Sequence, residues 1–454
     1  MRLSAELHRE AEVLVGRRLG LRLPPERLAD LERVLADGLR ASRLPSADAY
    51  LGWLEGLSIG SPEWSRIAAR LTVGETYFFR DRASFEGLAQ HVLPALIAAR
   101  RSEGALRLRL WSAACATGEE AYSLAILLDG LIPDYSAWSI TLLATDINQE
   151  ALAAARRGLY REWSLRETST EVRDRYFRTR RGSALELTPR IRERVTFGPL
   201  NLAEDGYPSL ATNTCAMDVI LCRNVLMYFD PAVQRKSVVR LQSALVQGGW
   251  LLLSPVEASP ELLRPLKPVD LPGAVFHRKE EEIEPPPPTA VFPPHTSLGS
   301  VLKPTIGRLS PSEAAREEGV PADGMDELLS KGRALADQGQ LETARRVAEA
   351  AVDRARLDPE GHLLLAAICQ ELGDTAAARQ GLRRAIYLAP DCAPAHLLLG
   401  TLLLRSGEPR RGRRCLENAI RLLESLPNEQ AVEGAGGLTA GRLKETARAY
   451  LAER

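Results

Sequence analysis

Hydrophobic and polar positions alternate most clearly between residues 106 and 122, and this segment determines the expected fold. Leu106, Leu108 and Leu110 alternate with arginines, which is the period of a β-strand. Small residues occupy 112–118, and an apolar helix is predicted over 122–128. A strand, a tight turn and a helix open a doubly wound α/β domain, whose ligand lies at the carboxyl ends of the strands. A structural turn in another α/β protein fits this segment equally well, and the missing G-x-G-x-x-G order argues against a dinucleotide site.

Further buried strands extend the predicted sheet. Residues 139–148 predict a strand that ends in Asp146, followed by a helix over 149–157. An acid at the end of the second strand is where such folds bind ribose hydroxyls. The apolar run 217–222 predicts a parallel strand. After it we expect a helix over 231–247, a turn at Gly248-Gly249, a strand over 250–254 and a last edge strand over 274–278.

Helical spacing of apolar residues predicts a separate N-terminal subdomain over residues 1–70. Its arginines form a solvated face or, as the sharper alternative, a docking surface for an acidic helix; they are Arg17, Arg18, Arg22 and Arg27. The α/β domain then covers residues 71–280. Near its start, Phe78 and Phe79 precede Arg80, whose guanidinium either pairs with a neighbouring acid or binds an anionic ligand group.

An arginine-rich section at about 160–200 interrupts the α/β pattern. Short alternating runs at 184–187 and 194–197 predict a small antiparallel insertion. Its excess of basic residues favours either an acidic partner or a solvated loop. These residues are Arg173, Arg175, Arg178, Arg180, Arg181, Arg190, Arg192 and Arg194.

The C-terminal part of the chain carries an internal repeat. A proline-rich linker is predicted over 281–324, because it includes the run 285–288 and further prolines. Beyond it, Gly339, Gly373 and Gly407 recur at intervals of 34 residues, the period of the tetratricopeptide repeat. Residues 325–454 are therefore expected to form three helical repeats and a closing helix near 438–453. Such a domain presents a curved surface to a peptide or protein partner.

Composition narrows the classes of function. The 59 basic and 59 acidic residues balance, and no aromatic and basic ladder is present, so nucleic-acid binding is not expected. The six cysteines show no metal-ligand spacing, and no metal is expected. The N-terminus lacks the apolar core of a signal peptide, and no segment approaches the ~20 apolar residues that span a bilayer. We therefore expect a cytoplasmic protein without membrane insertion.

Five motifs in order make the sequence resemble the CheR-type chemoreceptor glutamate methyltransferases. The resemblance covers roughly residues 1–280, and the repeats make the chain similar to the tetratricopeptide-bearing branch of that family. In this sequence Ala116, Ala121 and the segment 254–257 depart from the commoner family pattern. The matching motifs are Gly74-Glu-Thr-Tyr-Phe-Phe-Arg-Asp81, Trp111-Ser-Ala-Ala-Cys-Ala-Thr-Gly-Glu-Glu120, Ala144-Thr-Asp-Ile147, Asn201-Leu202 and Cys222-Arg-Asn-Val-Leu-Met-Tyr-Phe-Asp230.

The resemblance implies a Rossmann-like α/β domain that transfers a methyl group from S-adenosylmethionine to receptor glutamates and releases S-adenosylhomocysteine. It implies that Asp146 binds the ribose and that Glu119 lies near the amino-acid end of the cofactor. Arg80 and Tyr228 are the expected catalytic residues: Arg80 positions the substrates, and Tyr228 either presents its hydroxyl to the reacting groups or packs in the core. The remaining cofactor contacts are expected from Thr76, Arg80, Ala114, Asn201, Leu202, Asn224 and Val225.

Two other functions remain open at this stage. The chain could be a cofactor-binding regulator that acts through its repeats with little turnover. Methylation of a nucleic acid or of a small molecule is the other hypothesis. The neutral net charge argues against a nucleic-acid substrate, and an enzyme that acts on a small molecule has no evident need for repeats. The expected partners are the cytoplasmic domain of a methyl-accepting chemoreceptor, as substrate, and an unknown protein or peptide at the repeats.

Overall fold

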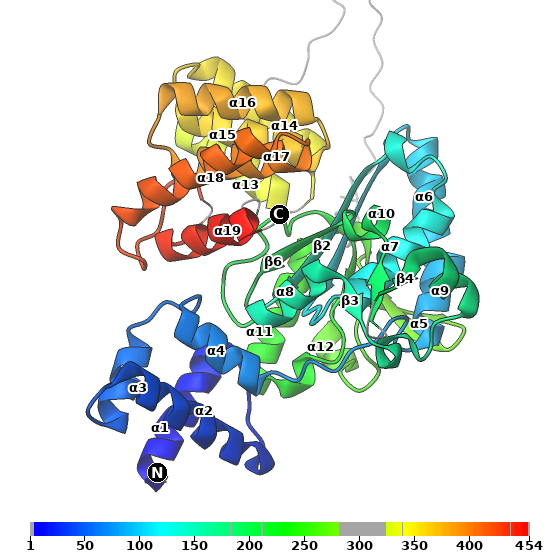
Figure 1. Cartoon of the computed structure of the whole chain (residues 1–454). Coiled ribbons are helices and arrows are strands. Elements are labelled where there is room, and N and C mark those ends of the chain that lie inside the picture. Colours follow the sequence, from blue (N-terminus) through cyan, green and yellow to red (C-terminus); the bar gives the residue numbers. More distant parts are fainter. Residues whose placement is uncertain are drawn as a thin grey trace, which may run out of the picture.

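The protein consists of an N-terminal group of helices, a central sheet covered by helices and a C-terminal stack of helices (Figure 1). This arrangement comes from a computed structural model, which describes residues 4–180, 184–209, 212–280, 324–337, 339–435 and 437–452. Nearly all of the predicted proline-rich linker lies outside the described residues. The predicted fold class, an α/β domain followed by an all-helical repeat domain, is confirmed.

The N-terminal helices pack around a core of their own. Leu31, Tyr50 and Trp64 are buried at its centre. Serine side chains accept from backbone N–H groups at several helix starts, which satisfies donors that have no partner inside a helix. Arg17 pairs with Glu55 on the surface. The helices are α1 (Ala5–Leu19), α2 (Leu28–Ser42), α3 (Ala47–Glu55) and α4 (Pro62–Leu71).

The central sheet has seven strands in the order β6-β2-β1-β7-β8-β10-β9. The first five run parallel, and β10 and β9 complete the sheet in antiparallel fashion. Because the parallel strands share one direction, their carboxyl ends meet at one edge. The strands are β1 (Arg107–Ala113), β2 (Ser139–Asp146), β6 (Val195–Pro199), β7 (Met217–Leu221), β8 (Leu245–Leu252), β9 (Lys267–Leu271) and β10 (Ala274–Arg278).

Three local predictions about the strands are wrong. The run 194–197 does not belong to the insertion, because β6 pairs with β2 in the main sheet. Residues 274–278 are not the edge, because β9 pairs outside them; β9 carries Pro268, which an edge strand tolerates. The Gly248-Gly249 pair lies inside β8, where the pairing with β7 shifts register, and does not form a separate turn.

Helices cover both faces of the sheet. Leu108 and Leu110 of β1 pack on one face with α7, whereas Trp111 points to the other face, where it shares a core with α11. The alternation predicted for β1 therefore separates two cores. The covering helices are α5 (Arg82–Gly87), α6 (Leu93–Ser102), α7 (Glu119–Leu131), α8 (Gln149–Arg157), α11 (Pro231–Ala244) and α12 (Pro260–Leu263).

The insertion forms a small antiparallel sheet, as predicted, in the order β3-β5-β4. Several of its arginines have acidic partners within the chain: Arg190 and Arg194 both pair with the buried carboxylate of Asp129. The basic excess is thus partly neutralised internally. Arg181 lies outside the described residues. The elements are β3 (Leu159–Tyr160), α9 (Thr170–Tyr176), β4 (Phe177–Thr179), β5 (Leu185–Leu187) and α10 (Pro189–Arg192).

The repeat domain consists of three helix pairs and a closing helix, as the 34-residue period predicts. Gly339, Gly373 and Gly407 separate the two helices of successive pairs, and each has a positive φ that favours glycine. The helices are α13 (Met325–Asp337), α14 (Leu341–Arg354), α15 (Pro359–Glu371), α16 (Thr375–Leu388), α17 (Ala393–Arg405), α18 (Pro409–Glu424) and the closing α19 (Ala440–Ala452).

The repeats dock on the α/β domain at the amino ends of its strands. Arg109 of β1 forms an ion pair with Glu371 of α15 at 2.5 Å, and both side chains are at least 95% buried. Cys215 and Ala216 share a hydrophobic core with α13 and α15. The face formed by the first helices of the repeats is therefore in contact with the chain itself.

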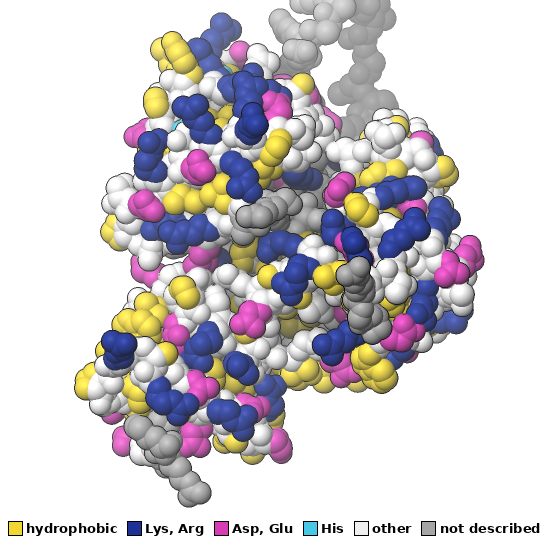
Figure 2. All heavy atoms as spheres, viewed as in Figure 1, with side chains coloured by type: hydrophobic (Ala, Val, Ile, Leu, Met, Phe, Trp, Pro, Cys, Tyr) yellow, Lys and Arg dark blue, Asp and Glu magenta, His cyan; other side chains and the backbone are white. Residues whose placement is uncertain are grey.

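The surface mixes charges of both signs. Figure 2 shows basic and acidic side chains interspersed over the visible face, with Lys and Arg frequent over the repeat helices. This distribution is consistent with the balanced composition. Among the helices of the described residues, none is both long enough and apolar enough to cross a membrane.

Candidate functional site

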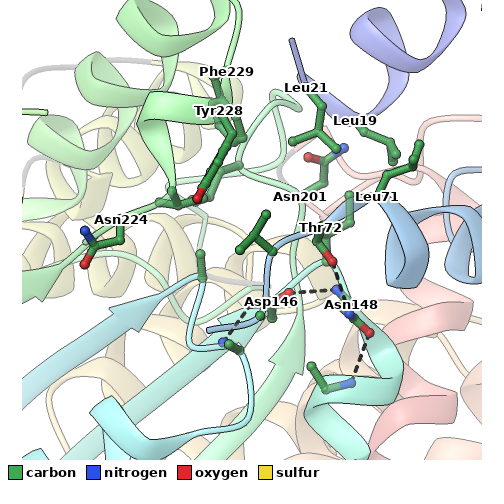
Figure 3. Close-up of a pocket in the computed structure, with 18 of the residues that line it drawn as sticks. Leu19, Leu21, Leu71, Thr72, Asp146, Asn148, Asn201, Asn224, Tyr228 and Phe229 are labelled. Atoms are coloured by element: carbon green, nitrogen blue, oxygen red, sulfur yellow. Dashed lines mark hydrogen bonds between the residues drawn. The ribbon is translucent and has the colours of Figure 1, made fainter. Parts of the chain in front are cut away.

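A cavity opens at the carboxyl ends of β1, β2 and β7, where the N-terminal helices meet the sheet (Figure 3). Its lining combines strand-end residues of the α/β domain with apolar residues from α1, α4 and the segments that follow them. The residues are Leu19, Leu21, Leu71, Thr72, Val73, Gly74, Ala114, Ala116, Asp146, Ile147, Asn148, Ala151, Leu200, Asn201, Leu202, Asn224, Val225, Tyr228 and Phe229.

Asp146 ends β2 at this cavity. One carboxylate oxygen accepts from the backbone N–H of Ala116 and the other from that of Asn148, both at 2.8 Å. Burial raises the pKa of Asp146, and these backbone hydrogen bonds oppose the shift. Each oxygen keeps further acceptor capacity, so the group can receive hydroxyl donors from a ligand. The side chain of Asn148 donates to Thr72, which connects the site to the end of α4.

The turn after β1 brings the backbone close to the cavity. Ala114 and Ala116 both have positive φ, at 61° and 47°, which is an uncommon conformation for a residue with a side chain. Gly118 has φ of 90°, and a Cβ there would lie 2.8 Å from the Cβ of Ala155. Gly118 is thus required by the path of the chain. Strained backbone of the kind found at Ala114 and Ala116 is concentrated at functional sites.

The segment after β7 forms a second wall, and a buried carboxylate holds it. Asn224 has φ of 58°. Glu257 accepts from the backbone N–H groups of Asn224 at 2.7 Å and Val225 at 2.6 Å, and more weakly from that of Met227. Ser254 donates to the same carboxylate. Glu257 therefore fixes the course of the chain into η5 (Leu226–Tyr228), and the hydroxyl of Tyr228 points into the cavity (Figure 3).

A buried arginine connects the strand ends behind this wall. Arg223 contacts Asp81 at 3.0 Å and Glu120 at 3.4 Å, and Ser112 donates to Glu120 at 2.7 Å. Burial raises the pKa of Glu120, and the charge of Arg223 opposes that shift. This network joins the ends of β1 and β7 to α7 and the start of α5, so it holds the turn and the second wall in register.

The third wall lies where the N-terminal helices meet the loop after β6. The Asn201 side chain donates to the backbone carbonyl of Arg18 at 2.8 Å. The Leu202 carbonyl accepts from Ser237 at 2.8 Å and from Tyr207 at 3.0 Å. The cavity is therefore closed partly by a subdomain that has its own core.

The structure brings seven of the predicted site residues together and leaves three apart. Thr76, Arg80 and Glu119 are not part of the described lining. Arg80 donates to the backbone carbonyl of Glu75 and lies over the ring of Tyr77. Glu119 is buried and accepts from Thr117 and Ser164, and burial raises its pKa. The cavity lining includes Ala114, Asp146, Asn201, Leu202, Asn224, Val225 and Tyr228.

The sequence reasoning missed the groups that support the walls. Glu257 and Arg223 received no role, although a charged residue directly after a buried strand was a signal for Arg223. Leu19 and Leu21 were also missed, because nothing local indicates that α1 reaches the cavity. Within the described parts of the chain, no group of three His, Cys, Asp or Glu side chains is placed to hold a metal ion.

Comparison with known proteins agrees with this geometry. A family model described as CheR methyltransferase, SAM binding domain, matches residues 74–271, and a tetratricopeptide repeat model matches residues 359–392. Chemotaxis protein methyltransferase 1 of Pseudomonas aeruginosa is 38% identical over 219 residues, 47% of this chain and 77% of that protein. Probable biofilm formation methyltransferase WspC of the same organism is 28% identical over 443 residues, 90% of this chain and 97% of that protein. Chemotaxis protein methyltransferase 2 of Vibrio cholerae is 33% identical over 228 residues, 50% of this chain and 77% of that protein.

Proposed function

The chain belongs to the CheR methyltransferase family, and from this premise we propose how its residues carry out the reaction. It is an S-adenosylmethionine-dependent methyltransferase that acts on chemoreceptor glutamates in chemosensory signalling. The observation that carries the assignment of the site is the cavity at the strand ends, with a buried Asp146 that two backbone N–H groups orient.

Asp146 receives hydrogen bonds from the ribose hydroxyls of S-adenosylmethionine. Its buried, oriented carboxylate and the adjacent small residues at 114 and 116 support this assignment, because they combine an acceptor with close backbone approach. Asn201, Asn224 and Val225 contact the adenine and methionine portions, since they line the same cavity. Leu202 contributes apolar surface there. The donor set therefore fits a ligand with hydroxyl, amino and apolar parts.

The methyl group is transferred by in-line displacement. A carboxylate oxygen of the receptor glutamate forms a bond to the methyl carbon while the bond from carbon to sulfur breaks, so that the products are a methyl ester and the neutral thioether S-adenosylhomocysteine. The glutamate is already ionised at neutral pH, so the reaction requires orientation and partial removal of water and does not require a strong base.

Tyr228 is the residue best placed to contact the reacting groups. Its hydroxyl points into the cavity from a segment that Glu257 holds (Figure 3). Arg80 positions the receptor carboxylate from outside the cavity. Thr76 lies on the same connection between α4 and α5, and Glu119 acts near the amino-acid end of the cofactor from behind the turn. These three roles rest on the family resemblance.

The partners follow from the substrate. Chemoreceptor glutamates that receive methyl groups lie in the cytoplasmic part of the receptor, so we place this enzyme in the cytoplasm. The repeats supply a surface for a second protein or peptide, as tetratricopeptide domains do. Part of that surface is already in contact with the catalytic domain, which leaves the remaining faces to an external partner.

Radiolabelled methyl transfer tests this proposal. The full chain is incubated with labelled S-adenosylmethionine and receptor cytoplasmic fragments, and base-labile label on the receptor is the expected result. Asp146→Asn should reduce cofactor affinity about a hundredfold at neutral pH, since it removes a charged acceptor from a buried site. Cofactor binding without label on any receptor would refute the catalytic proposal and favour a regulatory protein.

A further inference from the structure

The closing helix α19 connects the repeats to two separate parts of the catalytic unit. Figure 1 shows it between the repeat helices and the N-terminal helices. Arg442 forms an ion pair with Glu204 of the loop after β6, at 3.3 Å, and a second with Glu445 on its own helix. Ser58, in the connection between α3 and α4, donates to Glu445 at 2.8 Å. A continuous series of polar contacts thus connects the N-terminal subdomain through α19 to the catalytic domain.

At one end, this series of polar contacts reaches a residue that lines the cavity. The backbone N–H of Glu204 donates to the carbonyl of Asn201, whose side chain lines the cavity and donates to the carbonyl of Arg18. A displacement of Glu204 would therefore also displace the turn at Asn201, which forms part of the cavity wall.

The other end acts on the N-terminal subdomain, which forms the other half of the third wall. Ser58 belongs to the N-terminal subdomain, which supplies Leu19, Leu21 and Leu71 to the cavity. The subdomain packs around a core of its own, and Ile147, which follows β2, packs against that core. Glu445 therefore contacts the subdomain whose side chains line the cavity on this side.

These polar contacts are partly shielded from water. The side chains of Arg442 and Glu445 are 15% and 10% exposed, so solvent screens their interaction less than it screens a surface pair. The docking of the repeats does not depend on it, because the hydrophobic core at Cys215 and the Arg109–Glu371 pair hold α13 and α15 in place. Removal of Arg442 or Glu445 should therefore loosen the junction between the N-terminal subdomain and the loop after β6 without releasing the repeat domain.

We propose that Arg442 and Glu445 are positioning residues for the S-adenosylmethionine site, through which the repeat domain holds the N-terminal subdomain against the loop after β6 at the third wall of the cavity. The inference deepens the proposed function and rests on the assignment of this cavity to the cofactor. It also gives the repeats an effect on the site from within the chain: a partner that moves α19 would change cofactor affinity.

Calorimetric titration with S-adenosylhomocysteine tests the inference on the full chain. Arg442→Ala and Glu445→Ala should each weaken binding about fivefold, the lower end of typical coupling between sites. Arg442→Lys should restore part of the loss, because it keeps the charge opposite Glu204. Arg448→Ala on the same helix is the matched control, since Arg448 is exposed and pairs only distantly with Glu424; its affinity should equal that of the unmodified chain.

Thermal unfolding of each variant separates positioning from general stability. The inference expects weaker binding at an unchanged midpoint. Unchanged binding in both alanine variants would refute it. A loss of binding that is accompanied by a lower midpoint of unfolding would refute it as well. Failure of the unmodified chain to bind S-adenosylhomocysteine would instead refute the assignment of the cavity, so the two failures are distinguishable.

Discussion

Two buried carboxylates, Glu257 and Glu371, are satisfied in different ways and serve different purposes. Glu257 is 4% exposed and accepts from backbone N–H groups of one short segment of the cavity wall. Glu371 is 3% exposed and pairs with the guanidinium of Arg109 from another domain. A carboxylate held by local backbone donors shapes a loop, whereas one held by a distant guanidinium joins domains. Loss of the first should affect ligand binding most, and loss of the second should affect stability most.

Arg109 explains why the domain contact is costly to break. Besides Glu371, its guanidinium donates to the carbonyls of Cys215 and Asn213 and to the Asn213 side chain. These partners orient the group but carry no negative charge. Without Glu371, a buried cation would remain without a counter-charge, which proteins tolerate poorly.

The largest expected effect is therefore that of Glu371→Gln. The free energy of unfolding should fall by about 3 kcal/mol, because a neutral amide replaces the counter-charge of a buried arginine. Urea unfolding measures the loss. S-adenosylhomocysteine affinity should change less than twofold at low urea, since Glu371 lies at the opposite edge of the sheet from the cavity.

Glu349→Gln provides the control for that experiment. Glu349 pairs with Arg345 on the exposed surface of α14, where an ion pair contributes about 0.5 kcal/mol. A loss for Glu371→Gln that is no larger than the loss for Glu349→Gln would contradict the role given to the buried pair.

Glu257→Gln should show the reverse pattern. The amide keeps one acceptor but directs its NH2 group toward N–H donors, so the segment 224–227 loses its fixed course. S-adenosylhomocysteine affinity should fall about tenfold, equivalent to about 1.4 kcal/mol. Titration calorimetry measures the change, with Glu261→Gln on nearby α12 as the control. A tenfold loss in the control, or none in Glu257→Gln, would remove the distinction between the two carboxylates.

Local patterns predicted much of the fold. The 34-residue period places the repeat helices correctly because each repeat is a local unit with the same turn glycine. The strand, turn and helix at 106–128 were predicted for the same reason. The run 194–197 was assigned to the wrong sheet because strand pairing depends on β2, some fifty residues earlier in the chain.

The sequence indicates those residues of the candidate site that lie at strand ends. Ala114, Asp146 and Asn224 follow buried strands, and the shared edge of the sheet brings them together. The supporting groups were not predictable in this way. Arg223 contacts Asp81, which is 142 residues away in the sequence. Glu371 belongs to the repeat domain, and no sequence motif indicates which face of that domain docks on the sheet. Contacts of that kind arise from tertiary packing alone.

Tyr228 extends the comparison to a residue that faces the cavity from the segment held by Glu257. Tyr228→Phe keeps the ring and removes one hydroxyl, so we expect kcat for methyl transfer to fall about fivefold, the equivalent of one hydrogen bond of about 1 kcal/mol. S-adenosylhomocysteine affinity and the midpoint of unfolding should stay unchanged. Equal losses in kcat and in stability would instead assign Tyr228 to the core.

The smallest expected effect is a pH dependence that comes from Asp146, a third buried carboxylate, which backbone donors hold at the cavity itself. Burial raises its pKa, so its contribution to folding stability is present below the unfolded-state pKa of about 3.9 and is lost as pH rises through the folded-state pKa. In the binding mode that we propose, ribose hydroxyls donate to the ionised form of Asp146, so the pH dependence of binding has the opposite sign. Acidification from neutral pH should therefore stabilise the unliganded protein while it weakens S-adenosylhomocysteine binding.

Asp146→Asn separates the contribution of Asp146 to the pH dependence of stability and of binding from the contributions of other acids. Neighbouring groups such as Glu119 and Glu120 also have pKa values raised by burial, and their contributions remain in the variant. The difference between the unmodified chain and Asp146→Asn, measured by thermal unfolding and by calorimetry over the same pH series, should show stability and affinity changing in opposite directions. Parallel slopes in the two proteins would mean that Asp146 does not titrate as a ligand-binding carboxylate, and the contrast among the three acids would then rest on Glu257 and Glu371 alone.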